Sequence, residues 1–166
     1  MAFIEIRTIP DPVLRKIAKP VKDITDGILK LSGDMIETMR LSNGAGLAAN
    51  QVGFPIRLIT IDEHINKQEN RHIVLVNPVI VETDSEETAE EGCLSVPKYY
   101  EYVKRAKKVL ARGVSLKGET IEIECEGQLA RALQHEIDHL NGILFIDHLS
   151  PVKKNLFKKK YQKGNK

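Results

Sequence analysis

A chain of 166 residues with 42% hydrophobic residues, 29% charged residues and a net charge of +2 can fold as one globular domain that buries roughly 70% of its surface. This composition excludes a disordered chain, and the sequence has neither a long apolar run nor a basic, apolar leader, so we expect no membrane span and no signal peptide. Two widely separated cysteines, Cys93 and Cys125, indicate free thiols in a reducing compartment, so we expect a single cytoplasmic domain over residues 1–166.

The first half of the chain predicts one helix, a loop and two strands. Residues 23–41 carry apolar side chains at helical spacing. Residues 42–46 place two glycines around one small residue, which ends the helix and favours a loop that can approach a ligand closely. Short apolar runs with β-branched residues predict strands at 57–62 and 73–81.

The second half predicts two further strands and a second helix. Residues 107–116 and 120–125 alternate as strands do and are joined by a turn, which places Cys125 in the core. Residues 128–140 predict a helix that ends at Asn141-Gly142. Apolar side chains occupy one side of this helix and two histidines the other, a pattern that suits a helix in the centre of the fold.

The segment His135-Glu136-Ile137-Asp138-His139 indicates a metal site. Residues four apart lie on one face of a helix, so both imidazoles can bind a single ion. Glu136 projects to the side, where it can take a proton from water that the metal acidifies, as in zinc-type hydrolases. Two ligands do not hold a catalytic metal, so a third is required.

The third ligand has candidates on both sides of this segment. No glutamate follows Glu136, and the extended metzincin pattern lacks its third histidine, which excludes two known solutions. Asp147 and His148 remain as downstream candidates and would make the protein a metallopeptidase. Upstream, Cys93 follows Glu91-Gly92, and a thiolate with two imidazoles leaves a fourth position open to water. The histidine pair needs a partner, which favours Cys93.

Charge is distributed unevenly along the chain. Residues 150–166 contain seven lysines and no acidic residue, so the first 149 residues carry a net charge of −5. Leu156 and Phe157 give this basic segment an apolar side, which predicts a helix lying on the body. A basic segment on an acidic body indicates contact with a polyanion such as RNA, with a solvated tail as the alternative. An acidic patch is predicted in the middle of the chain, from Glu82, Asp84, Glu86, Glu87, Glu90 and Glu91.

Three segments, in this order, resemble the motifs of peptide deformylases: Gly44-Ala45-Gly46-Leu47-Ala48-Ala49-Asn50-Gln51, Glu91-Gly92-Cys93-Leu94-Ser95 and Gln134-His135-Glu136-Ile137-Asp138-His139. The likeness covers about residues 9 to 149, and three motifs in register are highly specific. That family removes the formyl group from the N-terminal methionine of new proteins in bacteria and organelles. A non-enzymatic, RNA-bound relative is the alternative, and intact Gln51, Cys93 and Glu136 argue against it.

The resemblance implies roles for individual residues. Cys93, His135 and His139 would bind one divalent metal ion, most often Fe²⁺, with Ni²⁺, Co²⁺ or Zn²⁺ as substitutes. Glu136 would act as general base and then as acid for the leaving amine. The Gln51 amide and the backbone N–H of Leu94 would hold the formyl oxygen, and Gly46 would contribute a close backbone contact.

The resemblance also implies a fold and partners. The expected fold is α+β, with antiparallel sheets packed around a central metal-binding helix, an N-terminal helix and a C-terminal helix. Expected partners are formyl-methionyl nascent polypeptides and, through residues 150–166, the ribosome or its RNA; we expect a monomer without membrane contact. The chain departs from the family pattern at Ala45, where a branched residue is usual, and at Asn50, where proline or threonine is common. We expect neither residue to touch the chemistry.

Overall fold

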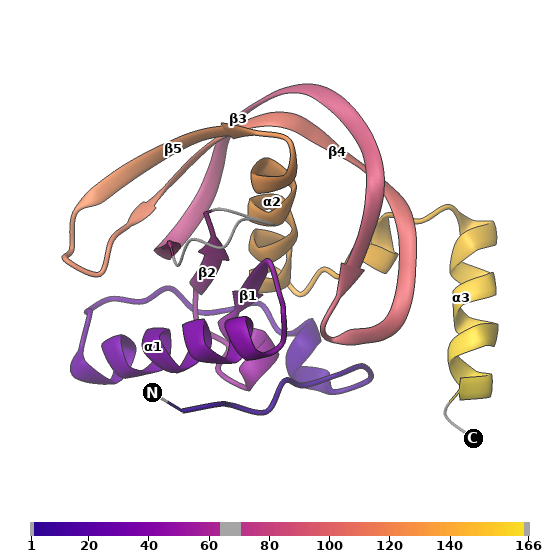
Figure 1. The fold of residues 1–166 in the computed structure, drawn as a ribbon, viewed down its shortest axis with the longest axis horizontal. Coiled ribbons are helices and arrows are strands. Elements are labelled where there is room, and N and C mark those ends of the chain that lie inside the picture. Colours follow the sequence, from indigo (N-terminus) through magenta and orange to yellow (C-terminus); the bar gives the residue numbers. More distant parts are fainter. Residues whose placement is uncertain (1, 64–70, 165–166) are drawn as a thin grey trace.

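An antiparallel sheet curves around one helix in the computed structural model, which describes residues 2–63 and 71–164 (Figure 1). Its five strands pair in chain order: β1 (Gly46–Ala48), β2 (Leu58–Asp62), β3 (His72–Cys93), β4 (Val96–Val114) and β5 (Thr120–Glu126). The helices are α1 (Asp26–Leu41), α2 (Gln128–Leu140) and α3 (Pro151–Gly164), with 3-10 turns η1 (Pro12–Arg15), η2 (Ala49–Val52) and η3 (Phe145–His148). The α+β class is therefore confirmed, although the strands form one sheet and not several.

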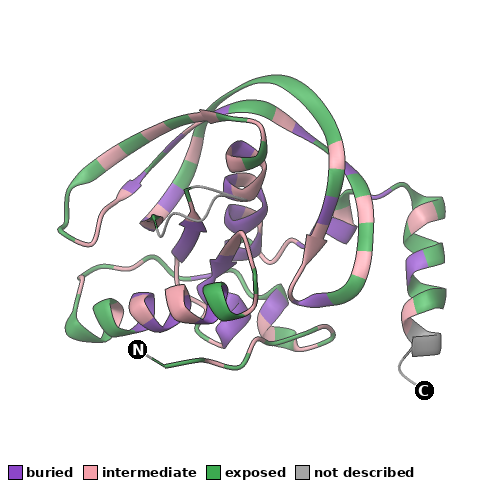
Figure 2. Ribbon diagram, viewed as in Figure 1, coloured by how far each residue is buried: buried purple, intermediate pink, exposed green. Residues whose placement is uncertain are grey.

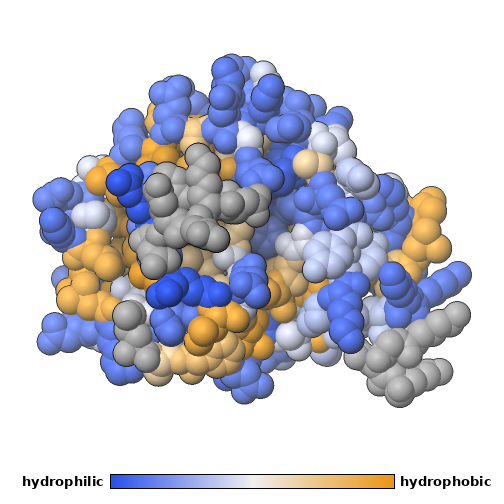
Figure 3. Space-filling model, viewed as in Figure 1, coloured by the Kyte–Doolittle hydropathy of each residue, from blue (hydrophilic) through white to orange (hydrophobic). Residues whose placement is uncertain are grey.

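The hairpin of β3 and β4 is much longer than the predicted strands at 73–81 and 107–116. At two positions in its charged part, an acidic residue of β3 lies opposite a basic residue of β4: Asp84 opposite Lys108 and Glu87 opposite Arg105. Such cross-strand pairs of opposite charge stabilise a sheet. The outer part of the hairpin is exposed in Figure 2, and the arch over α2 is mostly hydrophilic in Figure 3.

Helix α1 lies along one side of the sheet and closes the lower part of the core. It begins at Asp26 rather than at residue 23, because the Thr25 side chain accepts a hydrogen bond from the backbone N–H of Ile28 at 3.3 Å and caps the helix. Met35 and Met39 are completely or almost completely buried, and they belong to a core cluster with Leu47, Leu58 and Val76. This cluster supports β1 from the side opposite α2.

Helix α2 is enclosed by the sheet. Leu133 and Leu140 are fully buried in a cluster with Ile59 and Ala111 from the strands, and Cys125 is half-buried against the same cluster. On its other side, His135, Glu136 and His139 are also buried. Both the apolar and the polar side chains of α2 therefore face the interior rather than solvent.

Helix α3 lies at the side of the body, next to the ends of β3 and β4 (Figure 1). Phe157 is buried against the Tyr99 ring, with 4.6 Å between centroids, and the Tyr161 hydroxyl donates a hydrogen bond to the carbonyl of Ile9. Leu156 is exposed, so only one of the two predicted apolar contacts forms. Residues 165 and 166 of the basic segment lie outside the described residues.

Within the described residues, every helix is too short or too polar to cross a membrane.

Candidate metal centre

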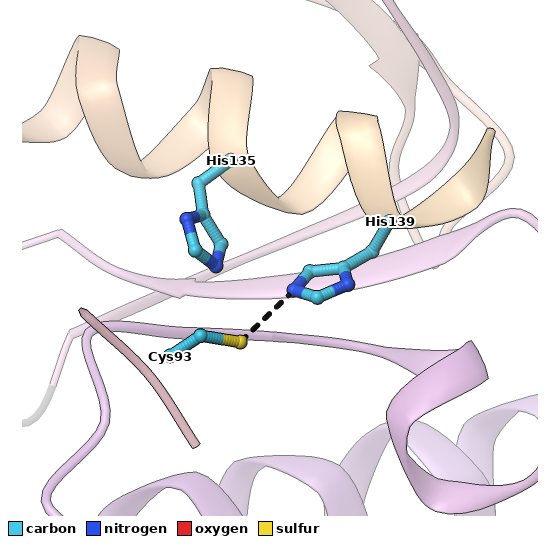
Figure 4. Close-up of side chains that lie close together, drawn as sticks. All are labelled: Cys93, His135 and His139. Carbon is cyan, nitrogen blue, oxygen red and sulfur yellow. Dashed lines mark hydrogen bonds between the residues drawn. The ribbon is translucent and has the colours of Figure 1, made fainter. Parts of the chain in front are cut away.

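Three side chains that can bind a metal meet between the end of β3 and helix α2 (Figure 4). Sγ of Cys93 lies 3.4 Å from Nε2 of His139, and the ligand atoms of Cys93, His135 and His139 all lie within 4.8 Å of one another. Two imidazoles and one thiolate are a donor set that suits a divalent transition metal. No other group of three such residues is this close together in the described part of the chain.

The alternative third ligands are engaged elsewhere. The Asp147 carboxylate accepts hydrogen bonds from the Arg15 guanidinium at 2.6 and 3.1 Å. Nε2 of His148 lies 2.8 Å from a carboxylate oxygen of Asp138. Neither residue belongs to the cluster around Cys93, so the geometry favours the upstream thiolate over the metallopeptidase alternative.

Glu91 contacts the ring nitrogen of His135 that does not face Cys93. One Glu91 oxygen lies 2.7 Å from Nδ1 of His135, which leaves Nε2 to face Cys93 (Figure 4). Arg105 donates to both Glu91 oxygens at 2.5 and 2.9 Å, and Arg131 donates at 2.7 Å. Burial alone would raise the pKa of Glu91, but the hydrogen bonds from His135 and Arg105 hold it well below its usual range. A carboxylate in this place fixes the tautomer and orientation of a metal-binding imidazole.

The prediction of an acidic patch is wrong for Glu91. Its side chain turns inward and is only 7% exposed, whereas Glu90 beside it is exposed. The reason is the pair of arginines, which our sequence analysis did not assign to the site. Arg131 could have been found, because it lies four residues before His135 on the same face of α2.

The network of charges extends from the site toward the surface. Arg105 also donates to Asp138 at 2.9 Å, and Asp138 is the partner of His148. Burial alone would raise the pKa of Asp138, but these hydrogen bonds lower it. Alternating charges therefore link the imidazole of His135 to an exposed histidine on η3.

Glu136 is buried beside the three candidate ligands. It is 4% exposed, and its Oε2 accepts no hydrogen bond from the described residues. Burial raises the pKa of Glu136 to about 7, although the charge of His135 opposes this. A carboxyl group with a pKa near neutrality can both accept and donate a proton. Glu136 also lines a cavity beside the three candidate ligands.

The cavity has a volume of about 460 Å³ and contains all but one of the predicted site residues in its walls, namely Gly46, Gln51, Cys93, Leu94, His135 and Glu136. His139 lies deeper, at 1% exposure. The Gln51 amide nitrogen donates to the Ser95 hydroxyl at 3.0 Å and lies 3.6 Å from Sγ of Cys93. Its amide oxygen accepts from the backbone N–H of Ala48 at 3.0 Å, so the NH₂ end is held toward the sulfur.

Gly46 lets β1 approach helix α2 closely. A Cβ atom at this position would lie 2.8 Å from Cγ of Glu136. At Gly44, a Cβ atom would lie 2.8 Å from Cδ1 of Leu94. Both glycines therefore allow close packing, against Glu136 and Leu94 respectively. The close approach of this loop to a ligand stays a prediction.

Comparison with known proteins identifies the family. The sequence model of polypeptide deformylase matches residues 3–155. The peptide deformylase of Syntrophobacter fumaroxidans is 51% identical over 163 residues, which cover 98% of this chain and 96% of the relative, and that of Thermodesulfovibrio yellowstonii is 49% identical over 98% of each. The crystal structure of a peptide deformylase from Legionella pneumophila superimposes with a TM-score of 0.91 at 47% identity, covering 99% of this chain and 96% of the other. The chain therefore belongs to the peptide deformylase family, metal-dependent hydrolases that remove the formyl group from the N-terminal methionine of newly made proteins.

Proposed function

We propose that the protein hydrolyses the N-terminal formamide of formyl-methionyl polypeptides and releases formate, with Cys93, His135 and His139 holding the metal ion. One observation carries this proposal. A thiolate and two imidazoles converge within 4.8 Å next to Glu136, whose buried carboxylate oxygen has no partner among the described residues. In this proposal α2 is the central metal-binding helix of the fold.

Each residue then has a defined task in the reaction. A bound divalent ion supplies a water of lowered pKa and polarises the carbonyl group. Glu136 accepts a proton from the attacking water and delivers it to the departing amine nitrogen, and a pKa of about 7 suits both steps. The Gln51 NH₂ group and the Leu94 N–H donate to the formyl oxygen as negative charge develops there. Each such donor is typically worth about 3 kcal/mol in the transition state.

Glu136→Gln tests this assignment directly. The variant keeps the size of the side chain and all three candidate ligands, so it should retain the metal and lose nearly all turnover. The assay follows release of formate from a formyl-methionyl peptide, with the acetyl-methionyl peptide as a control substrate. Full activity with retained metal would contradict the role of Glu136, and equal hydrolysis of both peptides would contradict the substrate class.

We propose Fe²⁺ as the native metal, with Ni²⁺, Co²⁺ or Zn²⁺ as substitutes, because a thiolate with two imidazoles accepts each of these ions. Fe²⁺ is redox-active beside an oxidisable sulfur, so activity of the iron form should decay in air. The nickel and cobalt forms should persist. Metal analysis after anaerobic purification identifies the ion. If the activity of all three metal forms decayed equally in air, the cause of inactivation would not be oxidation at the metal.

We further propose that the protein works as a cytoplasmic monomer whose helix α3 contacts ribosomal RNA. The buried Phe157 ring fixes this helix to the body, while Lys154, Lys158 and Lys159 are exposed. Lysines displayed on an ordered helix can bind phosphates without reading bases. Analytical ultracentrifugation should show a single species with about the mass of one chain, and a species of twice that mass would contradict the monomer.

Variants that remove lysine charges without removing α3 test the contact with ribosomal RNA independently of the stability of this helix. Truncation would also remove Phe157 from the core, so we prefer glutamine at Lys154, Lys158 and Lys159. These substitutions should weaken co-sedimentation with ribosomes and make it less dependent on salt, with peptide hydrolysis unchanged. The matched control places glutamine at three exposed lysines near the N-terminus, Lys16, Lys19 and Lys22. Equal sedimentation of both variants would exclude the contact.

A further inference from the structure

Asn50 links the segment that carries Gln51 to the helix that carries His139. Its side chain is fully buried on η2, and its amide nitrogen donates to the backbone carbonyls of His139 and Lys16, both at 3.0 Å. The amide oxygen has no hydrogen-bond partner among the described residues. The side chain is therefore held by its two donated bonds, and burial of the free oxygen is a cost that these bonds offset.

The two segments that Asn50 connects converge on the same atom. Nε2 of His139 lies 3.4 Å from Sγ of Cys93, and the amide nitrogen of Gln51 lies 3.6 Å from that sulfur. His139 comes from the last turn of α2, whereas Gln51 comes from η2 and is fixed there by the N–H of Ala48. Among the residues that the structure describes, Asn50 donates the side-chain hydrogen bond that joins η2 directly to the end of α2.

We propose that Asn50 is a positioning residue, which sets the place of the Gln51 amide relative to the His139 imidazole. This inference rests on the roles proposed above for Gln51 and His139.

Loss of the link should affect the transition state more than substrate binding. Without it, η2 can move relative to α2, and Gln51 moves with η2. An oxyanion donor that is displaced lowers kcat, because its bond is strongest when charge develops on the oxygen. The carbonyl of His139 also accepts from the N–H of Gly142 at 3.1 Å, so the end of α2 keeps a hydrogen bond.

Asn50→Asp tests the two donated bonds most directly, because it replaces the donating NH₂ group by an acceptor oxygen and keeps the shape of the side chain. Asn77→Asp is the matched control. Asn77 donates to the carbonyl of Val21 and accepts from its N–H, both at 2.8 Å, and it does not line the cavity of the site. The same chemical change at Asn77 therefore breaks a backbone clamp without touching the link to α2.

Three measurements are made on the metal-loaded proteins: Tm, the kinetics on a formyl-methionyl peptide well below Tm, and the visible absorption of the Co²⁺ form. Both variants should have a lower Tm. Asn50→Asp should lower kcat about tenfold or more with little change in KM, as expected for a small displacement at a reacting centre. It should also shift the Co²⁺ bands, since His139 loses a backbone contact. Asn77→Asp should leave kcat and the bands unchanged.

Unchanged kcat and unchanged Co²⁺ bands in Asn50→Asp, with a lower Tm as in the control, would show a purely structural role and overturn the inference. If Asn50→Asp does not fold, the same measurements are made on Asn50→Thr, which keeps one donor. A lower kcat and shifted Co²⁺ bands in that variant would support the inference, and unchanged values would overturn it. A wild-type protein inactive on formyl-methionine would contradict the proposed function, while the Co²⁺ bands and Tm still decide the role of Asn50.

Discussion

Replacing Gly46 by alanine would push a methyl group against Glu136. The new Cβ atom would lie 2.8 Å from Cγ, 3.0 Å from Oε1 and 3.1 Å from Cδ of that residue. Ordinary contacts of a Cβ atom begin at 3.4 Å, so the Glu136 side chain would have to move by at least about 0.6 Å. Glu136 is only 4% exposed, so few free positions are available to it.

The size of this displacement sets the expected loss of activity. A misplacement of about 1 Å can lower the rate of an enzyme about 100-fold. We therefore expect kcat of Gly46→Ala to fall between about 10-fold and 100-fold. Overpacking of a buried site typically costs about 1–3 kcal/mol, so the free energy of unfolding should fall by that amount.

The assay compares kcat on a formyl-methionyl peptide with the free energy of unfolding in urea. Gly27→Ala is the control, because the nearest atom to its new methyl group, Oγ1 of Thr25, lies 3.6 Å away. Gly27 is in α1, where alanine favours the helix by up to about 1 kcal/mol, so this variant should keep its kcat and gain stability. Wild-type kcat and stability in Gly46→Ala would refute the packing argument.

Three further predictions concern the cysteines and Glu91. Cys93→Ala should lose most bound metal and activity, measured by metal analysis beside the peptide assay; retention of both would exclude the thiolate as a ligand. Burial raises the pKa of the Cys125 thiol to about 11, so at pH 8 this thiol is ionised in about one molecule in a thousand. Iodoacetamide should therefore modify Cys125 far more slowly in the folded protein than in the unfolded protein, and mass spectrometry can follow both rates. Glu91→Gln leaves the buried Arg105 without its main counter-charge, so the free energy of unfolding in urea should fall by about 3–5 kcal/mol. A decrease of less than about 1 kcal/mol would contradict a strong buried ion pair.

The bounds of α2 and the face that carries both of its histidines could be predicted from the sequence. The four-residue spacing of His135 and His139 places them on one face, and Asn141-Gly142 ends the helix where expected. The approach of Cys93 could not be derived from spacing, because it is 46 residues from His139 and reaches it only through the course of the β3–β4 hairpin. The need of the histidine pair for a third ligand favoured Cys93, and the family motifs supported the same choice.

Two features depend on partners that lie far away in the sequence. The outer part of β3 has few of the residues typical of strands, and it is a strand because it pairs along its length with β4, whose outer part includes Tyr100, Tyr102 and Val103. Glu91 has acidic neighbours in the sequence, and it is buried because arginines from β4 and α2 surround it. Asn50 likewise has no local signal, since its partners come from α2 and the N-terminal segment.

The outer edge of the sheet affects how copies of the protein meet in concentrated solution. Strand β5 is the last in the strand order, so among the described strands its outer edge has no partner. An open edge invites pairing with a second molecule. Here Glu122, Glu124 and Glu126 are exposed along β5, and Glu122 and Glu126 form ion pairs with Arg112 and Lys108 of β4. Charged side chains on an edge strand oppose pairing with another chain, so this edge resists edge-to-edge aggregation.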